Sequence, residues 1–315
     1  LLRYFLFLLH PHLYVQNHIE QELKPGQSRD ERKSQLYYAF SERLDSPISE
    51  LTRAELQSVI DDKQAEGKVY MANRIRAAIR AFTGWAHKRG HMENDIGILL
   101  QRAGKERSRE RTPSLDEVRA IWSASFKMGD LWGPYFRLCI LTGQRCRSDV
   151  LQMQWSWIDF NRFCYEIPNP KNNRAHVVHL SSPAIDELAK LKKLQIRSPF
   201  VFTTTGDRAA SGVSRAKLLL DKYIFDEWRG PTFQSWVLHD LRRSQATALA
   251  EAGFDEGVVD RIQNHVASGS RASAVAAVYN KAQKLHERAK ALDAWARMVT
   301  GNASKVVSLK VGAKF

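Results

Sequence analysis

The chain of 315 residues is 43% hydrophobic and 26% charged, a composition that suits two domains, each able to bury its own core. A formal net charge of +14 and an isoelectric point near 9.8 favour a polyanionic partner, most commonly nucleic acid. The three cysteines, Cys139, Cys146 and Cys164, show no Cys-x-x-Cys spacing, which argues against a zinc site or a disulfide framework and indicates a reducing, cytoplasmic location.

The first nine residues, LLRYFLFLL, look like a signal peptide or a membrane segment. Arg3 interrupts the run and His10–Pro11 ends it, far short of the roughly 20 residues that span a bilayer. No small-residue cleavage site follows, and no polybasic block lies beside the run. We therefore expect no membrane partner, and we interpret residues 1–30 as a packed N-terminal segment or the remnant of a longer chain.

Residues 31–112 are expected to form a helical domain. Thr52 and Glu55 have the Thr-x-x-Glu spacing of a capping box, which predicts a helix that opens there and runs to about Lys63. Between Val69 and Arg89 the apolar residues recur with a helical period of about 3.6, which predicts an amphipathic helix. They are Ile75, Ala78, Ile79, Phe82, Trp85 and Ala86.

The other face of that helix carries cations. They are Arg74, Arg76, Arg80, Lys88 and Arg89. Residues 71–112 contain ten Lys or Arg against four Asp or Glu, a local excess of six positive charges. A solvated helix face would show the same pattern. Because the whole chain is also basic, we favour a DNA-binding surface that faces phosphates.

A linker is expected at residues 101–113, QRAGKERSRERTP, which are polar, charged and closed by a proline. Ser114 and Glu117 then repeat the capping-box spacing and restart a helix. The domain boundary is therefore expected near residue 112. A second domain would occupy 113–300, followed by a C-terminal tail at 301–315.

The second domain mixes helices with short strands. An apolar helix is expected from Trp132 to Cys146, ending near Thr142–Gly143. Strands are expected at 155–160, 163–167 and 175–180, with a polar hairpin at 169–174. Helices follow at 183–194, 213–228, 240–252, 255–263 and 271–299. The predicted fold class is mainly α with a small antiparallel β-sheet.

The stretch from Leu238 to Tyr279 carries groups suited to one kind of chemistry. His239 and Arg242 are three residues apart and share a face of the helix that begins at 239–240. His265 follows the end of the next helix. Taken singly, a His-Arg pair is more often a helix-cap pair and a tyrosine more often a core residue. Together, imidazoles, guanidinium groups and a tyrosine can hold, neutralise and attack a phosphodiester.

Five short motifs occur in the order and approximate spacing of one protein family. They are Thr142-Gly143-Gln144-Arg145, Lys171-Asn172-Asn173-Arg174, His239-Asp240-Leu241-Arg242-Arg243, Asn264-His265-Val266 and Val278-Tyr279. With them the chain resembles a tyrosine recombinase of the phage or genomic-island integrase type. The resemblance covers about residues 60–300. The helical domain at 31–112 resembles the core-binding (SAM-like) domain, and 113–300 resembles the catalytic domain.

The resemblance implies a role for each matching residue. Arg145 and Arg242 would bind the scissile phosphate, which suits the fork geometry of guanidinium groups. Lys171, in the hairpin, would protonate the leaving 5′-oxygen. His239 and His265 would assist proton transfer and hold the phosphate.

Tyr279 would be the nucleophile of this site-specific recombinase, forming a 3′-phosphotyrosyl link to DNA. Because the covalent link keeps the bond energy for religation, neither a metal ion nor a nucleotide cofactor is expected. The implied partners are double-stranded DNA attachment sites, a homotetramer on paired sites and accessory DNA-bending proteins, with a nucleoid-associated location. The C-terminal helix at 280–299 would dock on a neighbouring copy or pack in cis, and the sequence leaves both open.

One departure from the family pattern keeps alternatives open. The family usually places an acidic residue three positions after the first arginine, whereas Asp149 lies four after Arg145. Either one residue is inserted or the helix carries a bulge there, and Arg147 is the fallback. If neither arginine reached the phosphate, the chain would be a degenerate integrase that binds DNA without efficient cleavage. A type IB topoisomerase is a further alternative, which the hairpin and Asn264-His265-Val266 disfavour.

Overall fold

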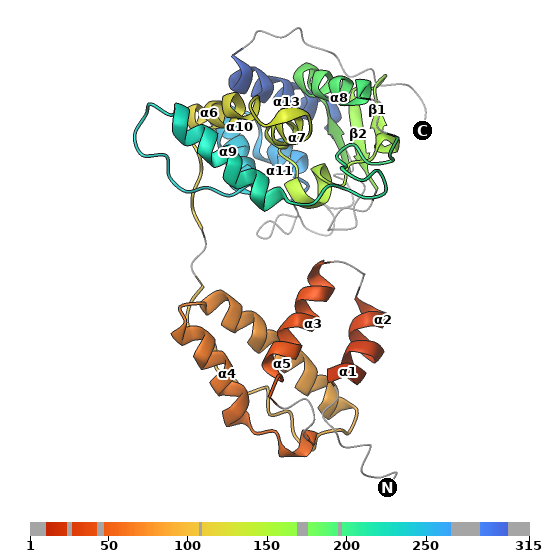
Figure 1. The fold of residues 1–315 in the computed structure, drawn as a ribbon, viewed down its shortest axis with the longest axis vertical. Helices are drawn as coiled ribbons and strands as arrows, with labels where there is room; N and C mark the ends of the chain where they lie inside the picture. Colours follow the sequence, from red (N-terminus) through yellow and green to blue (C-terminus); the bar gives the residue numbers. More distant parts are fainter. Residues whose placement is uncertain are drawn as a thin grey trace. The chain divides into compact units, whose positions relative to one another are not determined.

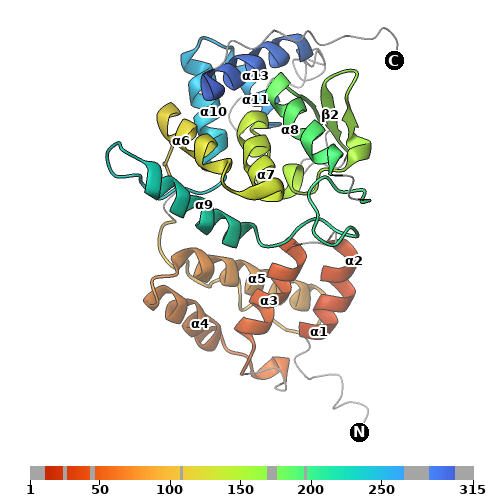
Figure 2. The ribbon, with the colours of Figure 1, turned by 45° about the horizontal axis from the view of Figure 1, so that its top comes forward.

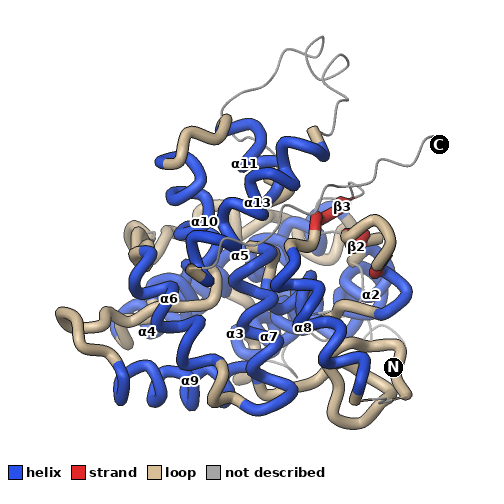
Figure 3. Tube along the Cα trace, turned by 90° about the horizontal axis from the view of Figure 1, so that it is seen from above, coloured by secondary structure: helices blue, strands red, loops and turns tan. Residues whose placement is uncertain are grey.

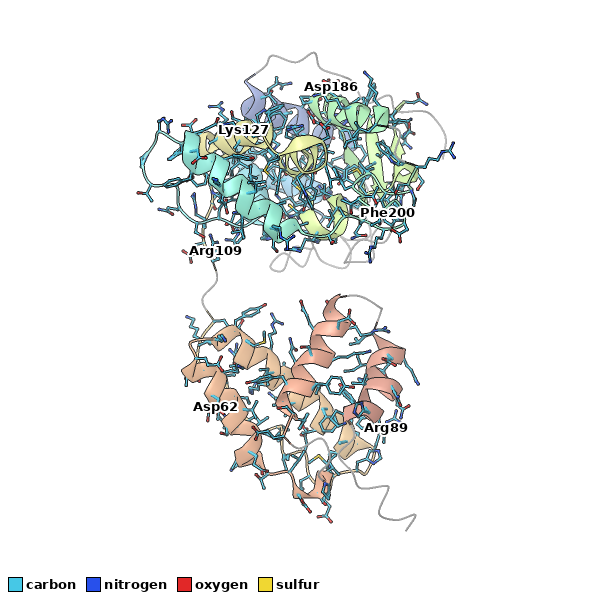
Figure 4. The ribbon with its side chains drawn as sticks, viewed as in Figure 1. Asp62, Arg89, Arg109, Lys127, Asp186 and Phe200 are labelled. Carbon is cyan, nitrogen blue, oxygen red and sulfur yellow. The ribbon has the colours of Figure 1, made fainter. Side chains whose placement is uncertain are left out.

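In a computed structural model of the chain, the structure describes residues 11–23, 27–42, 47–106, 109–168, 176–194, 197–265 and 284–301. The chain divides into two compact units, Leu1–Arg109 and Glu110–Phe315, and each is described by itself (Figure 1). Arg109, labelled in Figure 4, lies in the connection, close to the boundary expected near 112. The apolar stretch 1–9 lies outside the described residues. None of the described helices is long and apolar enough to cross a bilayer.

The first unit is built from helices. In chain order they are α1 (Pro11–Tyr14), the π-helical turn η2 (Val15–Ile19), α2 (Glu20–Glu22), α3 (Gln27–Ala39), the 3₁₀ turn η3 (Ile48–Glu50), α4 (Arg53–Ala65) and α5 (Val69–Lys88). Tyr14 packs against Phe82 and Trp85 of α5, with ring centroids 5.5 and 5.2 Å apart. Tyr14, in the N-terminal segment expected at 1–30, therefore packs on the helical unit.

Local sequence explains where α4 begins and which face α5 buries. The Thr52 hydroxyl accepts from the Glu55 backbone N–H, and the Glu55 carboxylate accepts from the Thr52 backbone N–H, so the predicted capping box is confirmed. The apolar residues at the helical period on α5 are buried in the core: Ile75, Ala78, Ile79, Phe82 and Ala86. The predicted helix 69–89 is confirmed to within one residue.

The second unit combines helices with one small sheet. Its elements are α6 (Leu115–Ser125), α7 (Gly129–Thr142), the π-helical turn η4 (Cys146–Val150), the 3₁₀ turn η5 (Trp155–Trp157), β1 (Ile158–Asp159), β2 (Cys164–Ile167), β3 (His176–His179), α8 (Ser182–Lys193), α9 (Val213–Glu227), α10 (Asp240–Glu251), α11 (Glu256–Ile262) and α13 (Leu285–Thr300). Residues 133–142 of α7 are all buried, and α6, α8, α10 and α13 pack around this helix (Figure 2). The predicted fold class, mainly α with a small antiparallel sheet, is confirmed.

The sheet is antiparallel with the order β1-β2-β3, and Ile167 of β2 lies opposite His176 of β3. Figure 3 shows β2 and β3 in red. The sheet lies beside α8 at one edge of the unit (Figure 1). The prediction of a strand over 155–160 is wrong for its first half, because Trp155–Trp157 form a 3₁₀ turn closed by the backbone of Trp157 and Gln154 at 3.0 Å. The hairpin expected at 169–174 lies outside the described residues.

The last described helix, α13, packs on the core of its own unit. The buried Trp295 donates from Nε1 to the carbonyl of Ile140 on α7 at 2.8 Å, and Arg119 of α6 donates to the carbonyl of Met298 at 2.9 Å. In this single chain the apolar stripe of the helix packs on its own unit, and docking on a neighbouring copy stays a prediction. The helix begins at Leu285, and the part expected before it, with Tyr279, lies outside the described residues.

Candidate active site

The first arginine of the candidate site lies at a backbone bend. Helix α7 ends at Thr142, and Gly143 adopts a left-handed conformation with φ of 62°. The turn η4 follows, in which the N–H of Val150 bonds the carbonyl of Arg145 at 3.1 Å, a π-helical i→i+5 bond. A π-helical turn accommodates one extra residue without breaking the helix, so the bulge that the displaced Asp149 suggested is confirmed.

Asp149 still reaches Arg145 across this turn. Its Oδ2 accepts from the backbone N–H of Arg145 at 3.3 Å and from Nη1 of the same residue at 3.4 Å. Its Oδ1 accepts from the hydroxyl of Ser148 at 2.7 Å. The carboxylate is buried, whereas 24% of the Arg145 side chain is exposed. Asp149 therefore holds the backbone N–H and one guanidinium nitrogen of Arg145, while part of the arginine side chain remains exposed.

Arg147, the fallback in the sequence, points elsewhere. Its Nη2 donates to the hydroxyl of Ser214 on α9 at 3.0 Å, on an exposed part of the surface. Between the two arginines, the geometry favours Arg145 for the candidate site.

Arg242 is buried between the ends of two helices. Its Nη1 donates to the carbonyl of Gly143, just beyond α7, at 2.5 Å, and its Nη2 donates to the carbonyl of Gln263, just beyond α11, at 2.7 Å. The last carbonyls of a helix have no partner within the helix, and they carry partial negative charge. The buried guanidinium satisfies both carbonyls. Arg242 can therefore be only 2% exposed although none of the described carboxylates forms an ion pair with it.

The two arginines lie close enough to affect each other. Burial, and then the positive charge of Arg145, lowers the pKa of Arg242 from 12.5 to about 10, so the guanidinium is still charged at neutral pH. The Nε of Arg242 is buried and has no hydrogen-bond partner among the residues that the structure describes. Two positive charges held near each other favour the binding of an anion.

His265 joins this cluster from the end of α11. Its Nε2 lies 3.3 Å from Nη2 of Arg242, and its Nδ1 lies 3.5 Å from the carboxylate of Asp260. Because a guanidinium can only donate, Nε2 is the acceptor and the ring proton is on Nδ1, facing Asp260. Burial and then Arg242 lower the pKa of His265, so the neutral imidazole dominates near pH 7.

The backbone just before His265 explains how the ring turns back toward Arg242. Asn264 has φ of 51°, a left-handed conformation that asparagine tolerates better than most residues. The chain therefore leaves α11 by a sharp turn at this asparagine.

His239 lies at the N-cap position of α10, one turn before Arg242. Burial, followed by Arg242 and Arg243, lowers the pKa of His239, and His265 acts on it in the same direction. Arg145, Arg242, His239 and His265 therefore lie close enough to change one another's pKa values. The other two predicted members, Lys171 and Tyr279, lie outside the described residues.

The basic residues of α5 do not share one face. At about 100° per residue, Arg76 lies roughly 200° around the helix from Arg74. Arg76 and Arg80 form one flank, and Arg76 is engaged there by the carbonyl of Leu100 at 2.8 Å. The other flank contains Arg74, Lys88 and Arg89, and Arg89 is labelled in Figure 4. These cations therefore lie on two flanks of the helix, and DNA contact by the exposed ones stays a prediction.

Residues that the sequence did not single out hold the cluster together. Gln144, His176 and Gln263 are all buried and make hydrogen bonds between the segments that carry the candidate residues. The adjacency of Gln144 to Arg145 was the only available signal. Within the described part of the chain, no group of three or more His, Cys, Asp or Glu residues is arranged to hold a metal ion.

Comparison with known sequences identifies relatives. A family model described as "Phage integrase family" matches residues 114–286. The prophage integrase IntA of Escherichia coli (strain K12) is 24% identical over 263 residues, which are 81% of this chain and 60% of that protein. The integrase of Escherichia phage lambda is 23% identical over 245 residues, which are 75% of this chain and 65% of that protein. The chain thus spans less than two thirds of the length of these relatives.

Comparison with solved structures establishes the shared fold. A crystal structure of a dimer of lambda integrase residues 75–356 bound to a COC′ core site aligns with a TM-score of 0.64 and 19% identity, covering 81% of this chain and 94% of that chain. A lambda integrase tetramer bound to a Holliday junction aligns with a TM-score of 0.64 and 18% identity, covering 84% of this chain and 79% of that chain. Because the family model matches more than half of the sequence, this chain belongs to the phage integrase family, and its resemblance to tyrosine recombinases is confirmed.

Proposed function

We propose that the chain is a tyrosine-type site-specific recombinase that cleaves and rejoins double-stranded DNA through a 3′-phosphotyrosyl intermediate. The observation that carries this proposal is the cluster of Arg145, Arg242 and His265 in a fold of the phage integrase family. A phosphodiester under attack gains negative charge on its non-bridging oxygens. Two pre-positioned guanidinium groups in a partly buried site stabilise that charge more in the transition state than in the ground state.

The two arginines have different tasks in this proposal. Arg242 is fixed by carbonyls on both sides, so it acts as a rigid, pre-positioned positive charge. Arg145 is partly exposed and tied to Asp149 at its base, so its outer N–H groups bind the second phosphate oxygen. Neutral His265, which accepts from Arg242 in this state, turns to the phosphate when DNA enters.

Proton transfer completes the proposed reaction. The Tyr279 hydroxyl oxygen attacks phosphorus, the bond to the 5′-oxygen breaks, and Lys171 gives that oxygen its proton. Neutral His239 takes the proton of the tyrosine; its lowered pKa keeps the imidazole in the accepting form near pH 7. Lys171 and Tyr279 enter on their motif positions alone. Religation by the 5′-hydroxyl reverses each transfer.

The remaining parts of the proposal concern DNA and assembly. The helical unit binds the duplex with the exposed cations of α5, and residues 101–113 link it to the catalytic unit. Four copies assemble on paired attachment sites, with accessory DNA-bending proteins as further partners and a nucleoid-associated location. The net charge of +14 supports a DNA partner, and lambda integrase crystallised as a tetramer on a Holliday junction offers the precedent for assembly.

A degenerate integrase that binds DNA without cleaving it is the second candidate. It was favoured by the displaced Asp149, because a shifted helix would carry the first arginine out of the site. The π-helical turn removes that reason, since Arg145 remains bonded to Asp149 and close to Arg242.

A nicked suicide substrate separates the two candidates. The attachment site is first selected from a pool of random duplexes by binding to the full chain. The selected duplex is then nicked so that the 5′-hydroxyl fragment diffuses away after cleavage, and covalent complexes are resolved on a denaturing gel. We expect an adduct that maps to Tyr279 and is absent in Tyr279→Phe. Selection of a bound sequence that never yields an adduct would leave the degenerate candidate.

Arg145→Ala and Arg147→Ala form a matched pair in this assay. We expect the first to lower the rate of adduct formation by about 100-fold or more, the usual effect of removing one transition-state donor, because it contacts the phosphate. The second should change the rate by less than about threefold, because Arg147 contacts Ser214. A reversed order would assign the catalytic role to Arg147.

Arg242→Ala tests whether catalysis and affinity are separate. We expect adduct formation to be lost while most of the DNA affinity remains, because affinity is spread over many phosphate contacts. Both are measured on the same duplex, by gel for the adduct and by fluorescence anisotropy for the Kd. Loss of binding in a variant that still folds would mean that the role assigned to Arg242 is wrong.

A further inference from the structure

Gln144 and His176 form a buried contact between segments far apart in the chain. Nε2 of His176 lies 3.1 Å from Oε1 of Gln144, and the two residues are 3% and 0% exposed. His176 begins β3, and Gln144 follows the bend after α7. The contact therefore joins the sheet to the turn that carries Arg145.

Both side chains also reach the end of α11. The carbonyl of Ile262 accepts from Nε2 of Gln144 at 2.7 Å and from Nε2 of His176 at 3.1 Å. The Gln144 amide donates as well to the carbonyl of Thr142, at 3.0 Å. One buried pair thus satisfies terminal carbonyls of both α7 and α11, which would otherwise lack partners.

Three segments with candidate catalytic residues meet at this pair. Gln144 directly precedes Arg145, and Ile262 lies three residues before His265. His176 lies five residues after Lys171 in the sequence and begins β3. Arg242 connects the same helix ends, because it donates to the carbonyls of Gly143 and Gln263. The Gln144–His176 pair and Arg242 therefore both hold the end of α7 against the end of α11.

The pair is built to donate hydrogen bonds and not to transfer protons. Burial, then the positive charges of Arg288, Arg242 and Arg145, lowers the pKa of His176 to about 3, so the ring is neutral at physiological pH. Since Nε2 faces two oxygen acceptors, the single ring proton is on Nε2. A neutral, fully buried ring fixed in one tautomer sets distances between segments.

We infer that Gln144 and His176 are positioning residues that hold Arg145 at its distance from Arg242 and His265. This inference rests on the proposed function, because the distance matters only if these groups act on one phosphate. A small displacement of a catalytic group costs large factors in rate without a matching loss of binding. The expected signature is therefore a slow reaction of a folded, DNA-bound protein.

The primary test is His176→Phe in the full chain on the nicked suicide duplex. Phenylalanine keeps the ring volume and removes the N–H donor. With protein in excess and saturating, we expect the single-turnover rate constant of adduct formation to fall at least tenfold, while the Kd for the duplex changes by less than threefold. A merely structural role would lower the final amount of adduct, because less protein is folded, and would leave the rate constant unchanged.

His179→Phe is the matched control on the same strand. His179 is also buried, but its Nε2 pairs with Asp293 of α13 at 3.0 Å and does not contact the Arg145 turn. We expect this variant to lose thermal stability and to keep the rate constant within threefold of the parent chain. Equal losses of rate in both histidine variants would reduce the effect to general destabilisation and overturn the inference.

Two further variants keep the test decisive if His176→Phe does not fold. His176→Gln places an amide N–H at about the reach of the lost donor, and it should recover most of the rate. Gln144→Met removes the same contact from the other side and should slow the reaction as His176→Phe does. In the double variant the combined loss should be smaller than the product of the two single losses, because both changes break the Gln144–His176 contact. Independent, multiplying effects would contradict a shared contact.

The failure of this inference is distinguishable from failure of the proposed function. If the parent chain forms no adduct on a duplex that it binds, the recombinase proposal fails, and the positioning role with it. If the parent chain forms the adduct and the rate constants of His176→Phe and Gln144→Met are unchanged, only the positioning role is wrong.

Discussion

Gly143 has no room for a side chain. Its φ of 62° is left-handed, and a Cβ atom built on it would lie 1.8 Å from Oε1 of Gln245. Gln245 is itself completely buried on α10, so it cannot swing away into solvent. The glycine thus lets the end of α7 approach α10 closely enough for its own carbonyl to accept from Arg242. The absence of a Cβ atom at Gly143 therefore sets the spacing between the end of α7, which leads to Arg145, and α10, which carries Arg242.

Gly143→Ala and Gly253→Ala separate conformational strain from this close approach. Gly253 also has a positive φ, 85°, but a Cβ there would meet nothing within 4 Å. We expect Gly253→Ala to lower the free energy of unfolding by about 1–2 kcal/mol, the cost of a left-handed alanine. Gly143→Ala should cost at least about 1 kcal/mol more, the scale of overpacking a core. Urea denaturation of both variants checks this, and equal costs would contradict the close contact.

His176 should also make stability depend on pH. The pKa is about 3 in the folded chain against an ordinary 6.5, so between these values the unfolded chain binds a proton that the folded chain does not. Stability from this group is therefore complete above pH 6.5 and is lost as the pH falls toward 3. Between pH 7 and pH 5 the expected loss is about 2 kcal/mol.

His176→Gln should remove this part of the acid sensitivity. Urea denaturation at several pH values from 7 to 5 would show a shallower decline for the variant than for the parent chain, whatever its overall stability. Parallel declines would mean that His176 is protonated in the folded protein.

At the scale of elements, a buried ion pair joins α7 to α8. Arg137 of α7 donates from Nη2 to the Glu187 carboxylate of α8 at 2.6 Å, and it also reaches the carbonyl of Ser125 at the end of α6. The guanidinium therefore connects α6, α7 and α8 of the second unit. Lys190 pairs with the other oxygen of the same carboxylate, but its side chain is 61% exposed.

Glu187→Ala should be strongly destabilising, because it leaves Arg137 buried without a counter-charge. The expected loss is about 3–5 kcal/mol in the free energy of unfolding. Lys190→Ala, which removes an exposed partner of the same carboxylate, should cost less than about 1 kcal/mol. Thermal or urea denaturation distinguishes the two, and a comparable effect of both would argue against a buried pair.

How much the sequence predicts depends on how local the cause is. The capping boxes at Thr52 and Ser114 involve residues three apart, so both were predictable and both are present. The bend after Gly143 and the bulge at Asp149 were also visible, because each leaves a mark in a short stretch. The partners of Gln144, by contrast, lie 32 and 118 residues away, and nothing near it in sequence announces them.

Distant contacts also determine the face of the basic residues on α5 and the turn at Trp155–Trp157. The basic residues of α5 were assigned to one face because they all avoid the apolar stripe, but avoiding one stripe leaves more than half of the circumference. Only the fold shows that Arg76 turns toward the carbonyl of Leu100. Likewise Trp155–Trp157 have strand-like composition but form a 3₁₀ turn. A distant segment of the same chain holds this turn, because the N–H of Trp155 bonds the carbonyl of Pro199 at 2.9 Å.

At the scale of the whole molecule, the charge of +14 should appear as salt-dependent DNA binding. The flank of α5 with Arg89 and the flank with Arg76 should contribute differently to this salt dependence. Arg89→Gln should reduce the slope of log K against log salt by about one, as expected for one phosphate contact. Arg76→Gln should mainly lower thermal stability, because it removes the contact to the Leu100 carbonyl. Fluorescence anisotropy over a range of salt measures the slopes, and equal slope changes would contradict the division of the flanks.

The position of α13 has a consequence for the order in which the protein is made. Trp295 is completely buried against α7, and Arg119 of α6 bonds a carbonyl 179 residues further along the chain. During synthesis these early helices emerge long before the helix that closes their core, and contacts between distant residues form slowly. The second unit can therefore finish folding only after translation has passed Trp295. Until then a nascent chain carries Arg145 and Arg242 in a unit whose core α13 has not yet closed.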